Sequence, residues 1–447
     1  MVRKYILKSI HIAYFFIIPV LILGVSVGYT SFLTLLEALL LLLLVSNRHS
    51  VGIFFIMYGG PLGGIIRLFL PSFPIYGVLL VAFGLWLVRD SLLEFFRTQL
   101  PSLLWLGLLL FIFFIYYLMG QMDEFASVKY FNMCVHATIM LVGYYVLNTS
   151  KKIEPEGLLR LMLLGAMLMF VFVTIFYDFV PGALFDYDWF REQVIEWTDA
   201  YGETDINYQH IGMLVLYGIS IYLAQLKLNP WKTAFYLLCS TQLILVSGCR
   251  QAILGLMVVV FLRYTLFSFS RVVRKYNPTV EVGYRLFARI LAFVFRLVLA
   301  FALGLMIISM LSYDIDVVSN TLDEGDVSRF YLFYQAWNLF LDHPLGVGIG
   351  GFHFYTGEVW PHNFILEILC ETGIIGSLVF LALIIINLIY KHIGLFYVTR
   401  SKLFYFIIIS ALFVRIMVST DLSESIEFFS AIFAIPPLLK SKKVLTQ

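Results

Sequence analysis

The sequence predicts an all-α, polytopic integral membrane protein with about 12–14 transmembrane helices, built as a single membrane domain over residues 1–447. Hydrophobic residues make up 61% of the chain, charged residues only 13%, and the mean hydropathy is +0.92. A soluble protein of this length needs about a quarter of its residues charged to cover its surface. Most of this surface must therefore face lipid, which excludes a soluble multidomain protein.

Charge and cysteine content exclude further classes. The formal net charge of +2 gives no bias towards polyanions, so we expect no nucleic-acid partner. The four cysteines are scattered without a CxxC pair, which suggests neither a zinc site nor a disulfide framework. The basic N-terminus and its apolar run lack a small-residue cleavage site, so we expect a retained first helix rather than a signal peptide.

Apolar segments of sufficient length give the candidate spans, because about 20 apolar residues cross a bilayer. The segments are 9–28, 30–45, 51–70, 75–88, 102–119, 126–147, 158–177, 207–225, 232–247, 251–268, 289–311, 363–390, 403–418 and 425–438. Several of them are short, so the expected number of crossings is 12–14 rather than a single value.

The distribution of lysine and arginine predicts which loops face the cytoplasm. With the N-terminus placed inside, the basic residues fall in the inner loops, as the positive-inside rule requires. They are Arg48, Arg89, Arg97, Lys151, Lys152 and Lys227, with clusters within 271–289, 391–402 and 440–443. Both termini are therefore expected in the cytoplasm.

Two long loops fall outside in this topology, and both are acidic. Residues 178–206 carry eight acids against one base, and residues 312–361 carry seven acids against Arg329 alone. The second loop has aromatic residues at helical spacing, which predicts a short amphipathic helix near 329–342 on the outer interface. Its expected apolar face consists of Phe330, Phe333, Trp337 and Phe340. We interpret the glycines of 346–351 as a flexible turn that returns the loop to the membrane.

Three side chains that break the positive-inside pattern or lie beside span ends map to the outer face, namely Arg250, Arg329 and His362. Guanidinium groups bind phosphate in a bidentate way and lose water more readily than ammonium groups. The three residues therefore predict a site for a phosphorylated, membrane-held substrate. The alternative is that both arginines snorkel to the interface or pair with the many nearby acids.

His362 has an alternative of its own, since a histidine at a helix start can simply cap the backbone. Asn363, Glu367 and Glu371 follow at intervals of four residues and share one helical face. Carboxylates near a helix N-terminus are favoured by the helix dipole, or they hold and orient the imidazole. The spacing leaves both interpretations open.

Metal binding is not predicted. Asp186 and Asp188, and likewise Asp314 and Asp316, form Asp-x-Asp pairs of a kind that can chelate a divalent cation. Two such pairs arise readily by chance in acidic loops, so we expect no metal and no cofactor.

Four motifs in order over about 207–390 resemble the O-antigen ligase and polymerase superfamily of bacterial membrane glycosyltransferases. The segment HNFILEILCETGIIG, from His362 to Gly376, looks like its signature. SRFYLFYQAWNLFLDHPLGVGIGGF, with Arg329, is similar to its arginine-led amphipathic helix and glycine turn. SGCRQAILG around Arg250 resembles its first arginine motif, and INYQHIG around Asn207 is loosely similar to its asparagine motif.

The resemblance implies a metal-independent enzyme whose donor is an undecaprenyl-diphosphate-linked oligosaccharide, acting at the periplasmic face of the bacterial inner membrane. It implies that Arg250 and Arg329 bind the diphosphate and that His362 is catalytic or orients the acceptor. Asn207, Asn363 and Glu367 would be supporting residues. Preorganised arginines can neutralise the charge of the leaving diphosphate. A neutral imidazole can take the proton of the attacking hydroxyl in an inverting, one-step displacement.

Three functions follow from this chemistry. A polymerase moves the growing chain onto another lipid-linked repeat unit, and is favoured because the acidic 178–206 loop should repel a phosphorylated acceptor. A ligase moves the finished chain onto lipid A core. A non-enzymatic transporter of the lipid-linked glycan is the third possibility, but the notable residues lie at one outer boundary instead of the midplane. Expected partners are the lipid-linked glycan, membrane lipids and, for a polymerase, a chain-length regulator.

Overall fold

The computed structural model describes residues 46–69, 76–150, 152–176, 208–225, 227–275, 327–392, 400–418 and 422–434. Every regular element within these ranges is a helix, as the composition predicts. The expected spans 9–28, 30–45 and 289–311, the loop 178–206 and the Asp-x-Asp pairs lie outside the described residues.

Helices occupy all the expected spans that fall within the described ranges. They are α3 (Arg48–Phe69), α4 (Tyr76–Leu87), α6 (Leu100–Met119), α7 (Glu124–Thr149), α8 (Pro155–Phe176), α10 (Tyr208–Leu223), α11 (Pro230–Val246), α12 (Arg250–Lys275), α17 (Phe364–His392), α18 (Arg400–Val418) and α19 (Leu422–Phe433). The predicted amphipathic helix is α15 (Val327–Asp342), and two helices were expected as loop, α5 (Arg89–Thr98) and α16 (Gly351–Thr356).

By length and composition, three helices of the described part can cross a membrane, at Leu100–Met119, Glu124–Thr149 and Phe364–Asn387. Four apolar helices of the described part are shorter, at 10–17 residues, and the number of crossings remains a prediction. The chain divides into two compact units. The first comprises Met1–Leu92, Thr149–Tyr222 and Lys227–Ile253, and the second Leu93–Asn148, Leu223–Leu226 and Leu254–Gln447.

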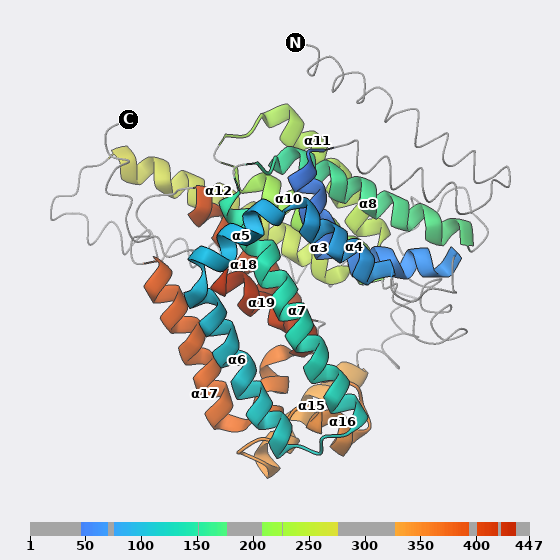
Figure 1. The fold of residues 1–447 in the computed structure, drawn as a ribbon, viewed down its shortest axis with the longest axis vertical. Coiled ribbons are helices and arrows are strands. Elements are labelled where there is room, and N and C mark those ends of the chain that lie inside the picture. Colours follow the sequence, from blue (N-terminus) through green and yellow to red (C-terminus); the bar gives the residue numbers. More distant parts are fainter. Residues whose placement is uncertain are drawn as a thin grey trace. The chain divides into compact units, whose positions relative to one another are not determined.

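In the first unit, α3 and α4 pack side by side (Figure 1) through glycine contacts. A Cβ atom on Gly63 would lie 2.2 Å from the backbone nitrogen of Gly77, and one on Gly84 would lie 2.7 Å from the carbonyl oxygen of Gly52. Only glycine permits this approach, because any side chain would force the two backbones apart. The glycines spaced through these two apolar segments therefore serve as a close helix–helix interface.

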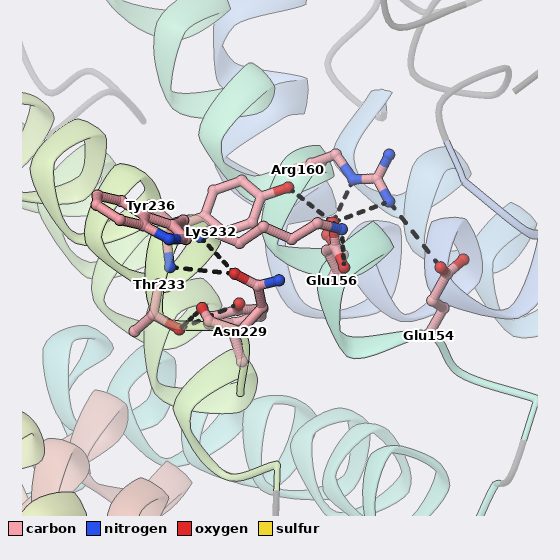
Figure 2. A network of polar contacts seen from close by, with 9 residues as sticks. Glu154, Glu156, Arg160, Asn229, Lys232, Thr233 and Tyr236 are labelled. Carbon is pink, nitrogen blue, oxygen red and sulfur yellow. Dashed lines mark hydrogen bonds and ion pairs between the residues drawn. The ribbon is translucent and has the colours of Figure 1, made fainter. Parts of the chain in front are cut away.

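Polar contacts at one end of the first unit join helix ends that the charge pattern assigns to the same side. Asn47, just before α3, donates to the carbonyl of Lys152 at 2.8 Å, and Arg48 binds Asp90 at 2.9 Å. Glu156 at the start of α8 accepts from Lys232 at the start of α11 at 2.8 Å (Figure 2). The predicted topology assigns these helix ends to one side of the membrane, and the contacts join them to one another. The compartment that they face stays a prediction.

The second unit contains the helices α6, α7 and α17, and α15 and α16 lie near one end of these helices (Figure 1). The turn between α6 and α7 meets the glycine-rich segment there, since a Cβ atom on Gly348 would lie 2.3 Å from the Cα atom of Gly120. The amide of Ile349 also donates to the carbonyl of Tyr116 at 3.3 Å. The short α6–α7 turn and the segment before α17 therefore belong to one end of the unit.

The predicted long helix over 363–390 is wrong in one respect, because α17 is broken at Gly373. This residue has φ 64° and ψ −169°, a conformation essentially confined to glycine. The ring of Phe429 packs against Phe364 at 5.7 Å and also against Phe380 at 5.8 Å between centroids. Sixteen residues of straight helix would separate those two rings by about 24 Å. The chain therefore turns back at Gly373, and residues 364–372 form a short helix of their own.

The buried face of α15 also differs from the expected one. Leu332, Ala336 and Leu339 are buried against Val347, Phe352 and Cys370. Trp337, expected on the apolar face, is 44% exposed, and Tyr331 and Tyr334 are more exposed still. The helix itself is confirmed, but its buried face is rotated about the helix axis from the predicted one. Apolar residues occur almost all round the helix, so their spacing fits more than one buried face.

Candidate functional site

His362 stands just before the short helix 364–372 in a strained backbone conformation. Its φ of 53° lies in the left-handed region, which few residues with a side chain adopt. The indole Nε1 of Trp360 donates to His362 Nδ1 at 2.9 Å, and the two rings meet edge to face. An indole nitrogen can only donate, so this hydrogen bond requires a lone pair on His362 Nδ1.

Asn363 caps the short helix. Its Oδ1 accepts from the amides of Ile365 and Leu366, both at 3.1 Å, and so satisfies two backbone donors at the helix start. Its Nδ2 donates to the carbonyl of Met417 on α18 at 3.4 Å. The predicted supporting residue thus holds the helix end beside His362 and ties it to α18.

Glu367 and Glu371 bind a buried lysine. Lys129 of α7 donates to Glu367 Oε1 at 2.6 Å and to Glu371 Oε1 at 2.7 Å. The three side chains are at most 4% exposed. Glu371 Oε1 also accepts from the amide of Gly350 at 3.0 Å. This cluster joins the short helix to α7 and to the glycine segment, and loss of one partner would leave an uncompensated buried charge.

The glycine segment 346–351 is tightly packed, so the expectation of a flexible turn is wrong. Gly346, Gly348 and Gly350 all have positive φ, from 79° to 91°. The amides of residues 347 and 348 donate to the carbonyls of residues 370 and 371, at 3.0 and 2.9 Å, and Ile374 donates back to Pro344 at 2.9 Å. The glycines are needed because a Cβ atom at each would collide with neighbouring groups.

Arg329 lies in the first turn of α15. α15 packs along α17, and the C-terminal ends of α15 and of the helix 364–372 are joined through the glycine segment. Arg329 is 13 residues before the end of α15, roughly 20 Å along its axis. The side chain of Arg329 is outside the described part.

Arg250 belongs to the first unit, where it is the first residue of α12. The corner between α11 and α12 packs against the start of α10, and Gln251 donates to Gln209 Oε1 at 2.7 Å. A Cβ atom on Gly212 would lie 2.4 Å from that of Cys249. Asn207 itself is outside the described residues, but it immediately precedes α10. The structure thus brings the corner that contains Arg250 and the start of α10 together.

Sequence reasoning missed three residues of the second unit. Lys129 is a basic residue at the predicted outer end of a span, which is the same signal that singled out Arg250. Trp360 has no distinguishing pattern, since aromatic residues are frequent throughout the chain. Arg415 on α18 forms a buried ion pair with Glu427 of α19, whose other carboxylate oxygen accepts from Tyr144 at 2.5 Å. A lone arginine near the end of an apolar segment was available as a signal for it.

Comparison with known proteins bears on this site. A family model described as O-antigen ligase matches residues 235–381, roughly a third of the chain. The matched stretch contains Arg250, Arg329, His362, Asn363 and Glu367, and it excludes Asn207. No curated protein and no solved structure matches the chain. Over residues 235–381 the chain is therefore similar to the O-antigen ligase family, which confirms the resemblance to the O-antigen ligase and polymerase superfamily seen in its motifs.

Proposed function

We propose that this protein is a membrane glycosyltransferase that moves a glycan from undecaprenyl diphosphate to the sugar hydroxyl of a second lipid-linked repeat unit. The observation that carries the proposal is the presentation of His362 on a strained backbone, within the stretch that matches the O-antigen ligase model. Strained residues persist where the surroundings hold them in place, and they cluster at functional sites.

The neighbourhood of His362 suits such a transfer. The Asn363 cap, the Lys129 cluster and the packed glycine segment fix the short helix from three sides. Catalysis by preorganised groups depends on this kind of support, because a small displacement of the reacting groups costs much of the rate. We propose that Arg329, in the first turn of α15, and Arg250 bind the two phosphates of the carrier.

We propose the polymerase in preference to the ligase on the acidic character of the loop 178–206, which disfavours a phosphorylated lipid A core as acceptor. The periplasm of a bacterial inner membrane is the proposed side of the reaction, because the positive-inside rule leaves the His362 segment outside. A transporter of the lipid-linked glycan is the alternative from another class, and it needs no reactive side chain.

The test is the surface-glycan ladder of a strain whose only copy carries His362→Ala, with the carrier-linked glycan extracted in parallel. A polymerase predicts loss of the ladder and single repeat units on the carrier or on a capped acceptor. A ligase predicts a normal ladder that remains on the carrier. An unchanged surface ladder would contradict both enzymatic functions.

His353→Ala is the matched control. His353 lies in α16, its Nδ1 is 3.2 Å from the carbonyl oxygen of Glu358, and its ring packs against Phe125. It tests whether loss of any histidine in this segment disturbs the ladder, and we expect the ladder to be retained.

A further inference from the structure

We infer that Trp360 is a positioning residue that holds His362 as a hydrogen-bond donor through Nε2. In this role His362 donates to a phosphate oxygen of the carrier diphosphate, and it does not take the proton of the acceptor hydroxyl. The inference rests on the proposed glycosyl transfer and deepens it, because it assigns the role of a single nitrogen atom.

The tautomer follows from the Trp360 hydrogen bond. The indole N–H has no acceptor function, so the contact at 2.9 Å requires a lone pair on His362 Nδ1. A doubly protonated ring would present an N–H group to the indole N–H, and the opposite neutral tautomer would do the same. The hydrogen bond therefore selects the neutral ring with its proton on Nε2.

The backbone keeps this pair together. Only Pro361 separates Trp360 from His362 in the chain, and proline fixes its own φ while it restricts the residue before it. His362, at φ 53°, lies between the buried Pro361 and the Asn363 cap. The imidazole cannot turn its Nδ1 away without leaving the indole N–H unpaired in a partly buried site, which costs free energy.

An imidazole held with its proton on Nε2 can donate to the leaving diphosphate but cannot deprotonate the attacking hydroxyl through that nitrogen. In the transfer, the acceptor oxygen bonds to the anomeric carbon as the bond from that carbon to the phosphate oxygen breaks. The electron pair of the broken bond passes to the diphosphate, and the proton of the hydroxyl is released to water. A donor aimed at the oxygen that gains charge stabilises the transition state. A base would instead need its lone pair on Nε2, which the Trp360 bond excludes.

The activities of two variants at His362 should rank in opposite order for a hydrogen-bond donor and for a general base. His362→Gln keeps an amide that can donate to phosphate while its oxygen accepts from Trp360, but an amide is no base. His362→Glu supplies a carboxylate base that repels phosphate. With carrier-linked glycan and purified protein, we expect His362→Ala to lose at least about hundredfold in kcat. His362→Gln should then retain more activity than His362→Glu. If His362→Glu is as active as His362→Gln or more active, the donor role is overturned.

Trp360→Phe tests the positioning role, because it keeps an aromatic ring and removes only the N–H donor. We expect kcat to fall roughly three- to tenfold, the effect of one hydrogen bond on the tautomer equilibrium. Nitrogen-15 NMR of histidine-labelled protein, with His362→Gln as the assignment control, should give an unprotonated Nδ1 in the wild type and a mixture in Trp360→Phe.

A protonated Nδ1 in the wild type, or no spectral change in Trp360→Phe, overturns the inference. The spectrum also separates this inference from the proposed function. If the wild type transfers no glycan, then the glycosyl transfer and the phosphate partner are rejected, while the NMR result still decides whether Trp360 sets the tautomer.

Discussion

The two units hold their charged side chains in opposite ways. In the first unit, Glu156, Lys232 and their neighbours form a network at helix ends (Figure 2), and the Lys232 side chain is 54% exposed. In the second unit, Lys129 lies between Glu367 and Glu371 with almost no exposure. Exposed pairs contribute little to stability, while a buried cluster is costly to assemble and costly to break. In the second unit the buried cluster joins α7 to the short helix 364–372, so we expect its loss to disturb that helix.

The largest expected difference comes from matched lysine substitutions in the two units. Lys129→Met leaves two buried carboxylates without their ammonium and should lower the free energy of unfolding by about 3–5 kcal/mol. Lys232→Met removes an exposed pair and should lower it by about 0–1 kcal/mol. Chemical denaturation of the purified protein in detergent measures both. Equal losses would show that burial does not distinguish the two networks.

A second pair of substitutions compares two glycines within the second unit. A Cβ atom on Gly373 would lie 2.2 Å from the carbonyl carbon of Leu345, and its backbone is in a glycine-only conformation. Gly373→Ala should therefore cost about 1–3 kcal/mol from backbone strain alone and abolish the surface ladder.

Gly107 of α6 is the control, because a Cβ atom there would meet nothing within 4 Å. Gly107→Ala should raise the free energy of unfolding by about 0.5–1 kcal/mol and leave the ladder intact. A tolerated Gly373→Ala would mean that α17 continues through residue 373 as a straight helix.

The smallest expected effect is the contribution of Glu156, in the first unit, to the pH dependence of stability. Burial by itself raises the pKa of Glu156, but the hydrogen bond and charge of Lys232, together with Arg160 and Tyr236, lower the pKa below its usual range. A carboxyl with a lowered folded-state pKa stabilises the protein above its unfolded pKa of about 4.3, and loses this as the pH falls through the folded value.

The wild type should consequently be more stable than Glu156→Gln at pH 7, by about 1 kcal/mol or less because the network is partly exposed. The difference should shrink below about pH 4. Thermal unfolding of both proteins between pH 3 and pH 7 checks it. A difference that stays constant over this range would show that ionised Glu156 contributes nothing through its charge.

Helices were predictable from the sequence because long apolar runs have few alternatives in a membrane. The break at Gly373 was not predictable, since one glycine within an apolar run is tolerated in a helix, and the break is visible only from its close approach to Leu345 and Gly346 and the hydrogen bonds around it. The partner of Glu367 was also hidden, because Lys129 is more than two hundred residues away in the chain. The local sequence pattern thus predicts the helices, whereas contacts between residues far apart in the chain determine how the helices position His362.

The central claim is that this protein itself breaks the bond between glycan and diphosphate. Purified wild-type protein and His362→Ala, each reconstituted into vesicles with undecaprenyl-diphosphate-linked repeat units, test it directly. We expect the wild type to release undecaprenyl diphosphate and to form glycan of more than one repeat, and His362→Ala to do neither. Lipid-linked repeat units that cross the vesicle membrane and stay intact, equally with both proteins, would contradict the claim and identify a transporter.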